Sequence, residues 1–216
     1  HRGCGRSIAA QESWRLDQWA DDVATFCNTL GIEKPLVFGQ SFGGMVAMHF
    51  AARHPQLPAK LILSSTAAQF LLDETVDIAK KLGGDRTGQV AHDFFSAPTV
   101  EGYERYAEVC LPLYNRKPAD EGAAYRNRAI QRPEVSVHFF SNEMMDMDLR
   151  PGIGAISCPT LVLGGAEDPV TPMRCSQEIA HAIGANARLE IFADCGHGVH
   201  RDDPKQAEKV MREFLA

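Results

Sequence analysis

An alternation of helical and strand patterns, broken once in the middle, constrains the fold of this chain more than any other feature. Apolar residues at helical spacing predict a helix from Leu16 to Leu30, and the apolar run over 35–39 predicts a strand buried on both faces. A helix over 43–53 and a strand over 60–65 follow in the same order. Strands that alternate with helices form parallel sheets, so this part of the chain predicts an α/β fold.

The region from about residue 69 to about residue 148 interrupts this rhythm. It is richer in charge, has no convincing strand and predicts several helices, for example over 76–82 and 100–110. The alternation then resumes with a strand over 159–164, a helix over 173–183, a strand over 189–192 and a closing helix over 204–215. We therefore expect a parallel sheet interrupted by a helical insertion of about 80 residues, within the usual error of such boundaries.

Composition and charge restrict the kind of partner. The net charge of -6 argues against nucleic acid or an anionic membrane surface as the main partner. No apolar run approaches the roughly 20 residues that span a bilayer, so we expect no membrane protein. The six cysteines form no C-x-x-C pair and no zinc-ligand spacing, which predicts reduced thiols in the cytoplasm and no metal site, although one disulfide stays an alternative.

A five-residue motif follows the first predicted strand. Residues 39–43 read Gly-Gln-Ser-Phe-Gly and match G-x-S-x-G, with Ser41 on the turn between a buried strand and a helix. We expect Gly39 and Gly43 to let strand and helix approach closely without a Cβ clash. The helix N-terminus favours negative charge, and the N–H of Phe42 would be an oxyanion donor. The alternative is a Gly-Ser turn without chemistry.

A serine nucleophile needs a base, and that base needs an orienting acid. Asp168 follows the strand over 159–164, and His197 follows the strand over 189–192. Both emerge at the same sheet edge as Ser41, where ligands bind in open α/β sheets. We therefore predict Ser41 as nucleophile, His197 as base and Asp168 as acid.

Each of these assignments has a rival nearby in the sequence. Glu167 competes with Asp168 as the acid, and His200 competes with His197 as the base. Asp194 could also be mistaken for the acid, and Asp168 could be only a turn carboxylate before Pro169. The order of the residues and their common edge favour Asp168 and His197.

Four segments together resemble the motifs of the α/β-hydrolase superfamily, closest to its proline iminopeptidase-like and carboxylesterase-like branch. They are 1–7 (the segment after the family's fourth strand), 39–45 (the nucleophile elbow), 165–172 (the acid loop) and 196–198 (the histidine loop). The resemblance covers the whole chain. It implies an α/β-hydrolase fold in which 1–66 and 149–216 form the core and 67–148 form a helical cap.

The resemblance also implies that the family's first strands, with the loop that gives the second oxyanion donor, precede His1. The strand over 36–38 would then lie at an unprotected edge. Losing one oxyanion donor typically costs about 10² to 10³ in rate. We therefore expect these 216 residues alone to be poorly active, poorly soluble, or both.

The expected activity is hydrolysis of an ester or related acyl bond of a small molecule, with no metal and no organic cofactor. Proline iminopeptidases hold the substrate amine with cap carboxylates, and Glu143, Asp146 and Asp148 are candidates by resemblance; the alternative is an acidic solvated surface. Phe42 stands where typical prolyl aminopeptidases favour Trp, which favours an esterase over a peptidase.

A serine at 41 argues against dehalogenases and epoxide hydrolases, which use a carboxylate nucleophile. A binding protein with an idle triad stays open, and so does the oligomeric state.

Overall fold

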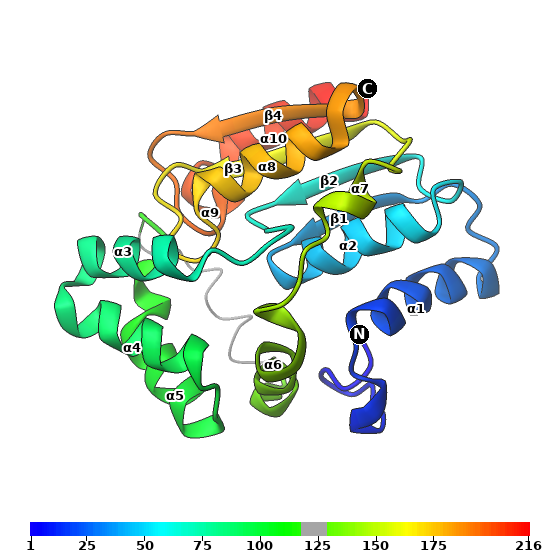
Figure 1. Ribbon diagram of the computed structural model, residues 1–216. Coiled ribbons are helices and arrows are strands. Elements are labelled where there is room, and N and C mark those ends of the chain that lie inside the picture. Colours follow the sequence, from blue (N-terminus) through cyan, green and yellow to red (C-terminus); the bar gives the residue numbers. More distant parts are fainter. Residues whose placement is uncertain (118–128) are drawn as a thin grey trace.

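A four-stranded parallel sheet forms the centre of the molecule (Figure 1). The computed structural model describes residues 1–117 and 129–216. The strands lie in the order β1 (Leu36–Gln40), β2 (Lys60–Ser64), β3 (Thr160–Gly165) and β4 (Ala187–Phe192), and each neighbouring pair is parallel. All four carboxyl ends therefore meet at one edge of the sheet. The predicted α/β fold with a parallel sheet is confirmed.

Helices cover both faces of this sheet. They are α1 (Leu16–Thr29), α2 (Phe42–Arg53), α7 (Arg150–Ile153), α8 (Met173–Ile183), η5 (Gly184–Asn186), α9 (Val199–Asp202) and α10 (Pro204–Leu215), while the short η1 (Gln11–Ser13) precedes α1 away from the sheet. Leu61, Leu63 and Val162 belong to the core cluster that includes α2 and α8. Ile62 and Leu161 point to the opposite face and pack with residues of α9 and α10. This alternation follows from the two-residue period of a strand, so consecutive apolar residues fill two separate cores.

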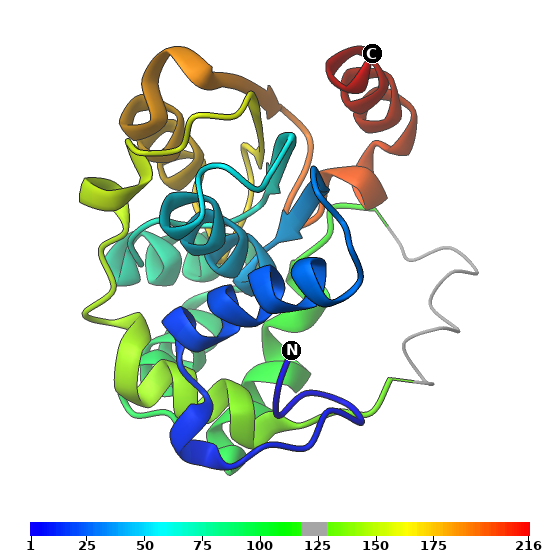
Figure 2. The ribbon, with the colours of Figure 1, turned by 90° about the vertical axis from the view of Figure 1, so that its right-hand side faces the viewer.

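A second group of helices lies together below the sheet in two perpendicular views (Figures 1 and 2). It consists of α3 (Leu72–Gly83), α4 (Asp85–Ser96), α5 (Val100–Val109), η2 (Leu111–Leu113), α6 (Pro133–Phe139) and the π-helical turn η4 (Phe140–Met144). The chain leaves the core and returns to it at one point, where Gln69 pairs with Asp148 and the N–H of Leu149 donates to the carbonyl of Ala68 (2.8 Å). The division into 1–66, 67–148 and 149–216 stays a prediction, and 118–128 of the predicted cap lie outside the described residues.

Strand β1 lies at the edge of the sheet, as predicted, but its predicted burial on both faces is wrong. Leu36 is 61% exposed and Phe38 50% exposed, whereas Val37 between them packs against the core. Alternate residues of a strand point to opposite faces. On the face that carries Leu36 and Phe38, α9 and α10 pack against Ile62 of the neighbouring strand, and the His200 ring of α9 reaches Phe38, yet both edge side chains stay half exposed. An apolar run alone therefore overstated the burial of this strand.

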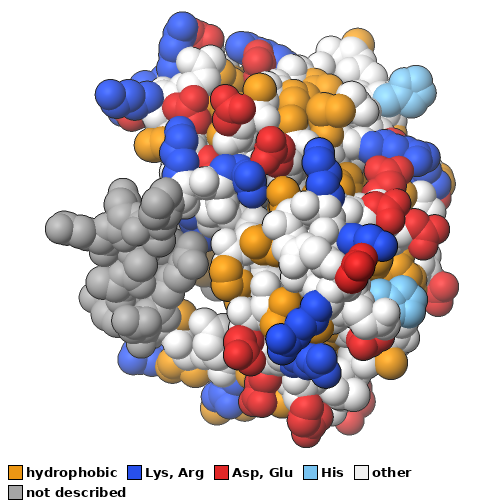
Figure 3. Space-filling view, turned by 90° about the vertical axis from the view of Figure 1, so that its left-hand side faces the viewer, with side chains coloured by type: hydrophobic (Ala, Val, Ile, Leu, Met, Phe, Trp, Pro, Cys, Tyr) orange, Lys and Arg blue, Asp and Glu red, His pale blue; other side chains and the backbone are white. Residues whose placement is uncertain are grey.

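The surface of the molecule mixes charges of both signs. On the face shown in Figure 3, Lys and Arg side chains lie interspersed with Asp and Glu side chains outside the grey region. No described helix combines the length and the apolar character that crossing a bilayer requires. Within 1–117 and 129–216, no three or more His, Cys, Asp and Glu side chains are grouped so that they could hold a metal ion.

Candidate active site

Ser41 occupies a sharp turn between the end of β1 and the start of α2. Its backbone has φ 52° and ψ −126°, a region that residues other than glycine rarely adopt and that costs about 1–3 kcal/mol. Neighbouring groups hold it there: its N–H donates to the carbonyl of Ser64 (3.0 Å), and its carbonyl accepts from Oγ1 of Thr66 (2.7 Å). The serine hydroxyl is thus presented at the carboxyl edge of the sheet.

Two glycines allow this turn to pack, and one of them differs from the expectation. A Cβ at Gly39 would lie 2.5 Å from the carbonyl oxygen of Gly43, and a Cβ at Gly44 would lie 2.5 Å from Thr66. A Cβ at Gly43 would have no heavy atom of the described residues within 4 Å. The predicted role of Gly43 in close packing is therefore wrong; Gly44, one residue further along α2, faces β2 instead.

Three polar side chains from the ends of three strands form a continuous hydrogen-bonded chain. Nε2 of His197 lies 2.9 Å from Oγ of Ser41. Nδ1 of the same ring lies 2.9 Å and 3.0 Å from the two carboxylate oxygens of Asp168. Asp168 has no exposed surface and His197 is 5% exposed, so water does not compete for the bond between them. The structure brings together the three residues predicted from the sequence.

Asp168 is held by more than the histidine. Its Oδ1 accepts from the N–H groups of Val170 (2.8 Å) and Thr171 (2.9 Å), and its Oδ2 accepts from Oγ1 of Thr171 (2.8 Å). A buried carboxylate requires such donors, because burial without them would favour its neutral form. Thr171 was not predicted from the sequence, since a threonine in a loop carries no recognisable signal.

A comparison of the sequence with protein families identifies the fold in which this strand–turn–helix occurs. Residues 1–204 match the family model described as the alpha/beta hydrolase fold. The chain belongs to the α/β hydrolase fold family. The predicted fold and the predicted class of hydrolytic enzyme are thereby confirmed.

Individual relatives of this α/β hydrolase include esterases and a proline iminopeptidase. A strigolactone esterase of Arabidopsis thaliana is 29% identical over 204 residues, which cover 93% of this chain and 73% of the relative. A thermophilic esterase of Thermogutta terrifontis is 27% identical with a TM-score of 0.70, over 99% of this chain and 76% of that one. The proline iminopeptidase of Mycobacterium smegmatis is 22% identical with a TM-score of 0.73, over 99% of this chain and 76% of that one. Similarity at this level of identity shows a shared fold alone.

The backbone of His197 in this α/β hydrolase is clamped from two sides. Its N–H donates to the carbonyl of Tyr114 (2.6 Å), and its carbonyl accepts from Nε2 of Gln40 (3.0 Å). The Tyr114 ring also meets the His197 ring edge to face, with centroids 4.9 Å apart. Burial raises the pKa of Tyr114, so its hydroxyl stays neutral and bonds to Tyr106 (2.9 Å). Tyr114 could not be predicted from the sequence, because it lies in no motif.

The rival acid and base have other partners. The carboxylate of Glu167 pairs with Arg116 (2.6 Å). The His200 ring packs against Phe38, with centroids 6.3 Å apart, and burial lowers the pKa of His200. Asp194 is exposed. The geometry therefore favours Asp168 and His197, as the sequence did.

Phe42 follows the serine and opens α2. The Ser41 side chain makes no capping hydrogen bond to this helix, so its hydroxyl is available to His197. The Phe42 ring packs against Trp19 (centroids 4.9 Å apart) and Phe139 (5.0 Å), which fixes the first turn of the helix. The role of the Phe42 N–H as an oxyanion donor stays a prediction.

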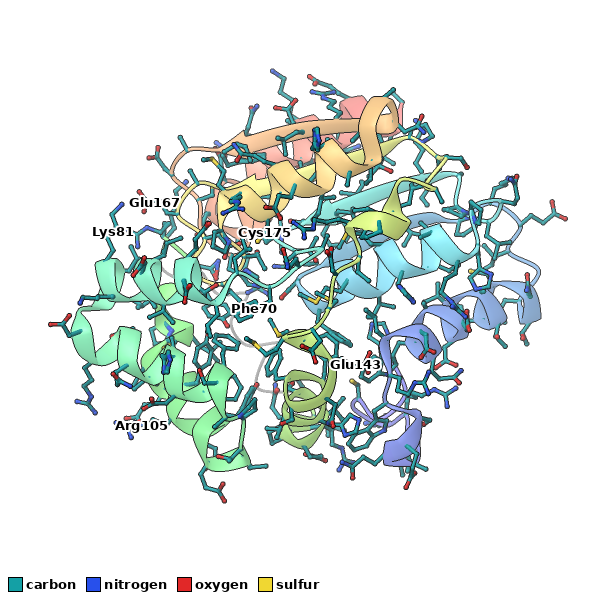
Figure 4. All side chains as sticks on the ribbon, viewed as in Figure 1. Phe70, Lys81, Arg105, Glu143, Glu167 and Cys175 are labelled. Carbon is teal, nitrogen blue, oxygen red and sulfur yellow. The ribbon has the colours of Figure 1, made fainter. Side chains whose placement is uncertain are left out.

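The three acidic candidates in the helical insertion line one surface groove, but their carboxylates differ in their partners. Glu143 accepts from the N–H of Leu16 (3.1 and 3.3 Å), at the N-terminus of α1. Asp148 pairs with Arg150 (2.8 Å), and Asp146 lines the groove beside Glu143. Figure 4 shows Glu143 between α6 and α1, well apart from Glu167 in the acid loop. A substrate-binding role for Glu143 and Asp146 stays a prediction.

Proposed function

We propose that this protein is a serine hydrolase that cleaves a carboxylic ester or related acyl bond of a small molecule through an acyl-enzyme. The observation that carries the proposal is the hydrogen-bonded chain from Ser41 Oγ through His197 to the buried carboxylate of Asp168. A serine hydroxyl becomes an effective nucleophile only beside such an oriented base.

The first half of the reaction forms the acyl-enzyme. Oγ of Ser41 attacks the carbonyl carbon of the substrate while its proton passes to Nε2 of His197. Asp168 holds the imidazole in the required tautomer and stabilises the imidazolium. The N–H of Phe42 stabilises the oxyanion of the tetrahedral intermediate. When that intermediate collapses, the carbon–oxygen bond to the leaving group breaks and His197 returns the proton to the leaving alcohol.

The second half reverses these roles with water. His197 removes a proton from a water molecule as it attacks the acyl carbon, and the bond to Oγ then breaks. The proton returns to Ser41, and the carboxylic acid product leaves. The donors for these steps are on the chain itself, so the proposal includes no metal and no cofactor.

An ester is favoured over a proline amide as substrate. Several of the proteins similar to this chain are esterases, among them the strigolactone esterase of Arabidopsis thaliana at 29% identity and the esterase of Thermogutta terrifontis at 27%. Glu143, one of the candidates for holding a substrate amine, already accepts from the N–H of Leu16. Phe42, at the position where typical prolyl aminopeptidases have Trp, also favours an ester as substrate. Proline iminopeptidase activity is therefore the second candidate, supported by the similarity of fold.

The test compares two substrates under identical conditions. We expect an aryl ester to be hydrolysed faster than a prolyl anilide, and the Ser41→Ala variant to lose this activity. If the protein hydrolyses the anilide and not the ester, its activity is that of an aminopeptidase, and the proposed esterase activity is wrong. If folded protein binds a small ligand, turns over neither substrate and leaves Ser41 unlabelled by an acylating probe, the protein is a binding protein on this fold.

We also propose that the protein works in the reducing cytoplasm. All six cysteines are free thiols, and five of them are buried. Cysteines kept in pairs by disulfides are typical of oxidising compartments, whereas single buried thiols are stable in a reducing one. Localisation of a tagged protein by fractionation tests this directly; recovery from an oxidising compartment would contradict it.

A further inference from the structure

A short segment of the insertion lies across the loop that carries His197. We call residues 114–117 the strap; they follow η2 and belong to none of the sequence motifs. The strap carbonyl of Tyr114 accepts from the N–H of His197 at 2.6 Å. The approach is so close that a Cβ at Gly196 would collide with the same carbonyl oxygen. The backbone of the insertion and the backbone of the histidine loop are therefore in direct contact.

A buried carboxylate joins the same two segments a second time. Asp202 has no exposed surface. Its Oδ2 accepts from the N–H of Gly196 (2.8 Å), one residue before His197. It also accepts from the strap: from the N–H of Arg116 (3.0 Å to each oxygen) and from the N–H of Lys117 (3.1 Å). Charge-assisted bonds of this kind are about twice as strong as neutral ones.

The neighbouring aspartate performs the ordinary structural task at this place. Asp203 is the N-cap of α10, and its side chain accepts from the N–H of Gln206 (3.2 Å). Capping of the closing helix therefore does not require Asp202. A buried charge needs a reason to be retained, and the hydrogen bonds to Asp202 that the structure shows all come from backbone N–H groups of the strap and the histidine loop.

We propose that Asp202 is a positioning residue that fixes the loop of the catalytic histidine against the strap. Through this contact the insertion keeps His197 within hydrogen-bonding distance of Ser41. The proposal rests on the function proposed above. The bond of 2.9 Å between His197 and Ser41 joins two separate strand ends, and a displacement of about 1 Å can cost about 10²-fold in rate. Gln40 holds the His197 carbonyl to the nucleophile turn, while Asp202 and Tyr114 hold the other side of the loop.

The first test measures kcat and KM for an ester with Asp202→Asn, and with Asp203→Asn as the matched control. An amide at 202 keeps one acceptor oxygen and places its NH₂ group against a backbone N–H, so it can accept from the strap or from Gly196 but not from both, and the link between them is broken. We expect kcat to fall about 10- to 100-fold, with a smaller change in KM. The control keeps its helix cap, because an asparagine oxygen can accept from the N–H of Gln206 as the aspartate does, so its kcat stays within about twofold of the wild type. Equal kcat values for both variants in folded protein would overturn the proposal.

The second test does not depend on activity. Amide hydrogen exchange is measured at His197, whose N–H bonds to Tyr114 and not to Asp202. If Asp202 holds the strap in place, Asp202→Asn releases Tyr114 and the His197 amide exchanges about tenfold faster or more, while Asp203→Asn leaves it unchanged. Unchanged exchange at His197 in Asp202→Asn would overturn the positioning role. A wild-type protein that does not hydrolyse esters would instead overturn the proposed function, and the exchange result would still decide the role of Asp202.

Discussion

At the scale of single residues, Asp168 is the member of the site whose environment is most specific. It accepts three hydrogen bonds besides that of His197, from Val170 and from both donors of Thr171. These bonds hold the carboxylate in place and aim it at Nδ1 of His197. Glu167 beside it is in a different environment, paired with Arg116 and about 40% exposed.

Asp168→Asn is expected to lower kcat about 10³- to 10⁴-fold, because an amide stabilises the wrong tautomer of the histidine and not the imidazolium. Glu167→Gln is the matched control and is expected to stay close to the wild type, because an exposed ion pair contributes about 1 kcal/mol or less to stability. Steady-state hydrolysis of an ester measures both. A larger loss from Glu167→Gln would show that the acid has been assigned to the wrong residue.

At the scale of elements, close packing of α2 against the end of β2 positions Ser41. Gly44 provides the contact surface, since Thr66 lies where its Cβ would be. Thr66 also donates to the carbonyl of Ser41, so the two contacts act on the same turn.

Gly44→Ala is expected to destabilise the protein by about 1–3 kcal/mol through overpacking against Thr66. Gly43→Ala provides the contrast: with open space at that position, alanine should stabilise the helix by up to about 1 kcal/mol. Urea denaturation of both variants measures the two free energies of unfolding. The packing assigned to Gly44 would be refuted by a Gly44→Ala variant as stable as Gly43→Ala.

Helices α1 and α2 are also linked by charge. Asp21 of α1 pairs with Arg53 (2.6 Å) and His54 (2.8 Å) at the end of α2. The hydrogen bond from Arg53, assisted by His54, lowers the pKa of Asp21 from 3.8 to about 2. The side chains of Asp21 and Arg53 are both more than a third exposed, so solvent screens the pair and its stabilisation is at most about 1 kcal/mol.

A depressed carboxyl pKa stabilises the folded state above the pKa of the unfolded chain, and this stabilisation disappears as pH falls through the folded value. Asp21→Asn is therefore expected to be less stable than the wild type at neutral pH, with the difference shrinking between about pH 4 and about pH 2. Denaturant titrations across this range measure the difference. A stability gap that stays constant down to pH 2 would contradict the assigned cause.

At the scale of the whole molecule, the strands, the elbow and the order of the site residues were predictable, because each is encoded locally. Apolar runs marked the strands, and G-x-S-x-G marked the turn at Ser41. Burial of β1 was not predictable, because an apolar run does not say which faces other elements cover. Asp202 was missed for a related reason: its bond to Arg116 joins positions 86 residues apart, and neither residue lies in a motif.

The distribution of thiols is a property of the whole fold and gives a simple test. Cys4 is half-buried and the other five cysteines are buried. Burial raises the pKa of Cys110 and Cys195 to about 11, which leaves little thiolate to react. We expect a thiol reagent at neutral pH to modify Cys4 first in native protein and all six cysteines after denaturation. Fewer than six reactive thiols in denatured, unreduced protein would reveal a disulfide.

The most direct measurement is covalent labelling of the protein with a fluorophosphonate, followed by mass spectrometry of the peptides, with Ser41→Ala treated in parallel. A fluorophosphonate reacts with a serine that an oriented histidine has activated. The hydrogen-bonded chain from Ser41 through His197 to Asp168 predicts one adduct, on Ser41, that is absent from the variant. Folded wild-type protein that forms no adduct, or forms it on another residue, would contradict the assignment of Ser41 as the nucleophile.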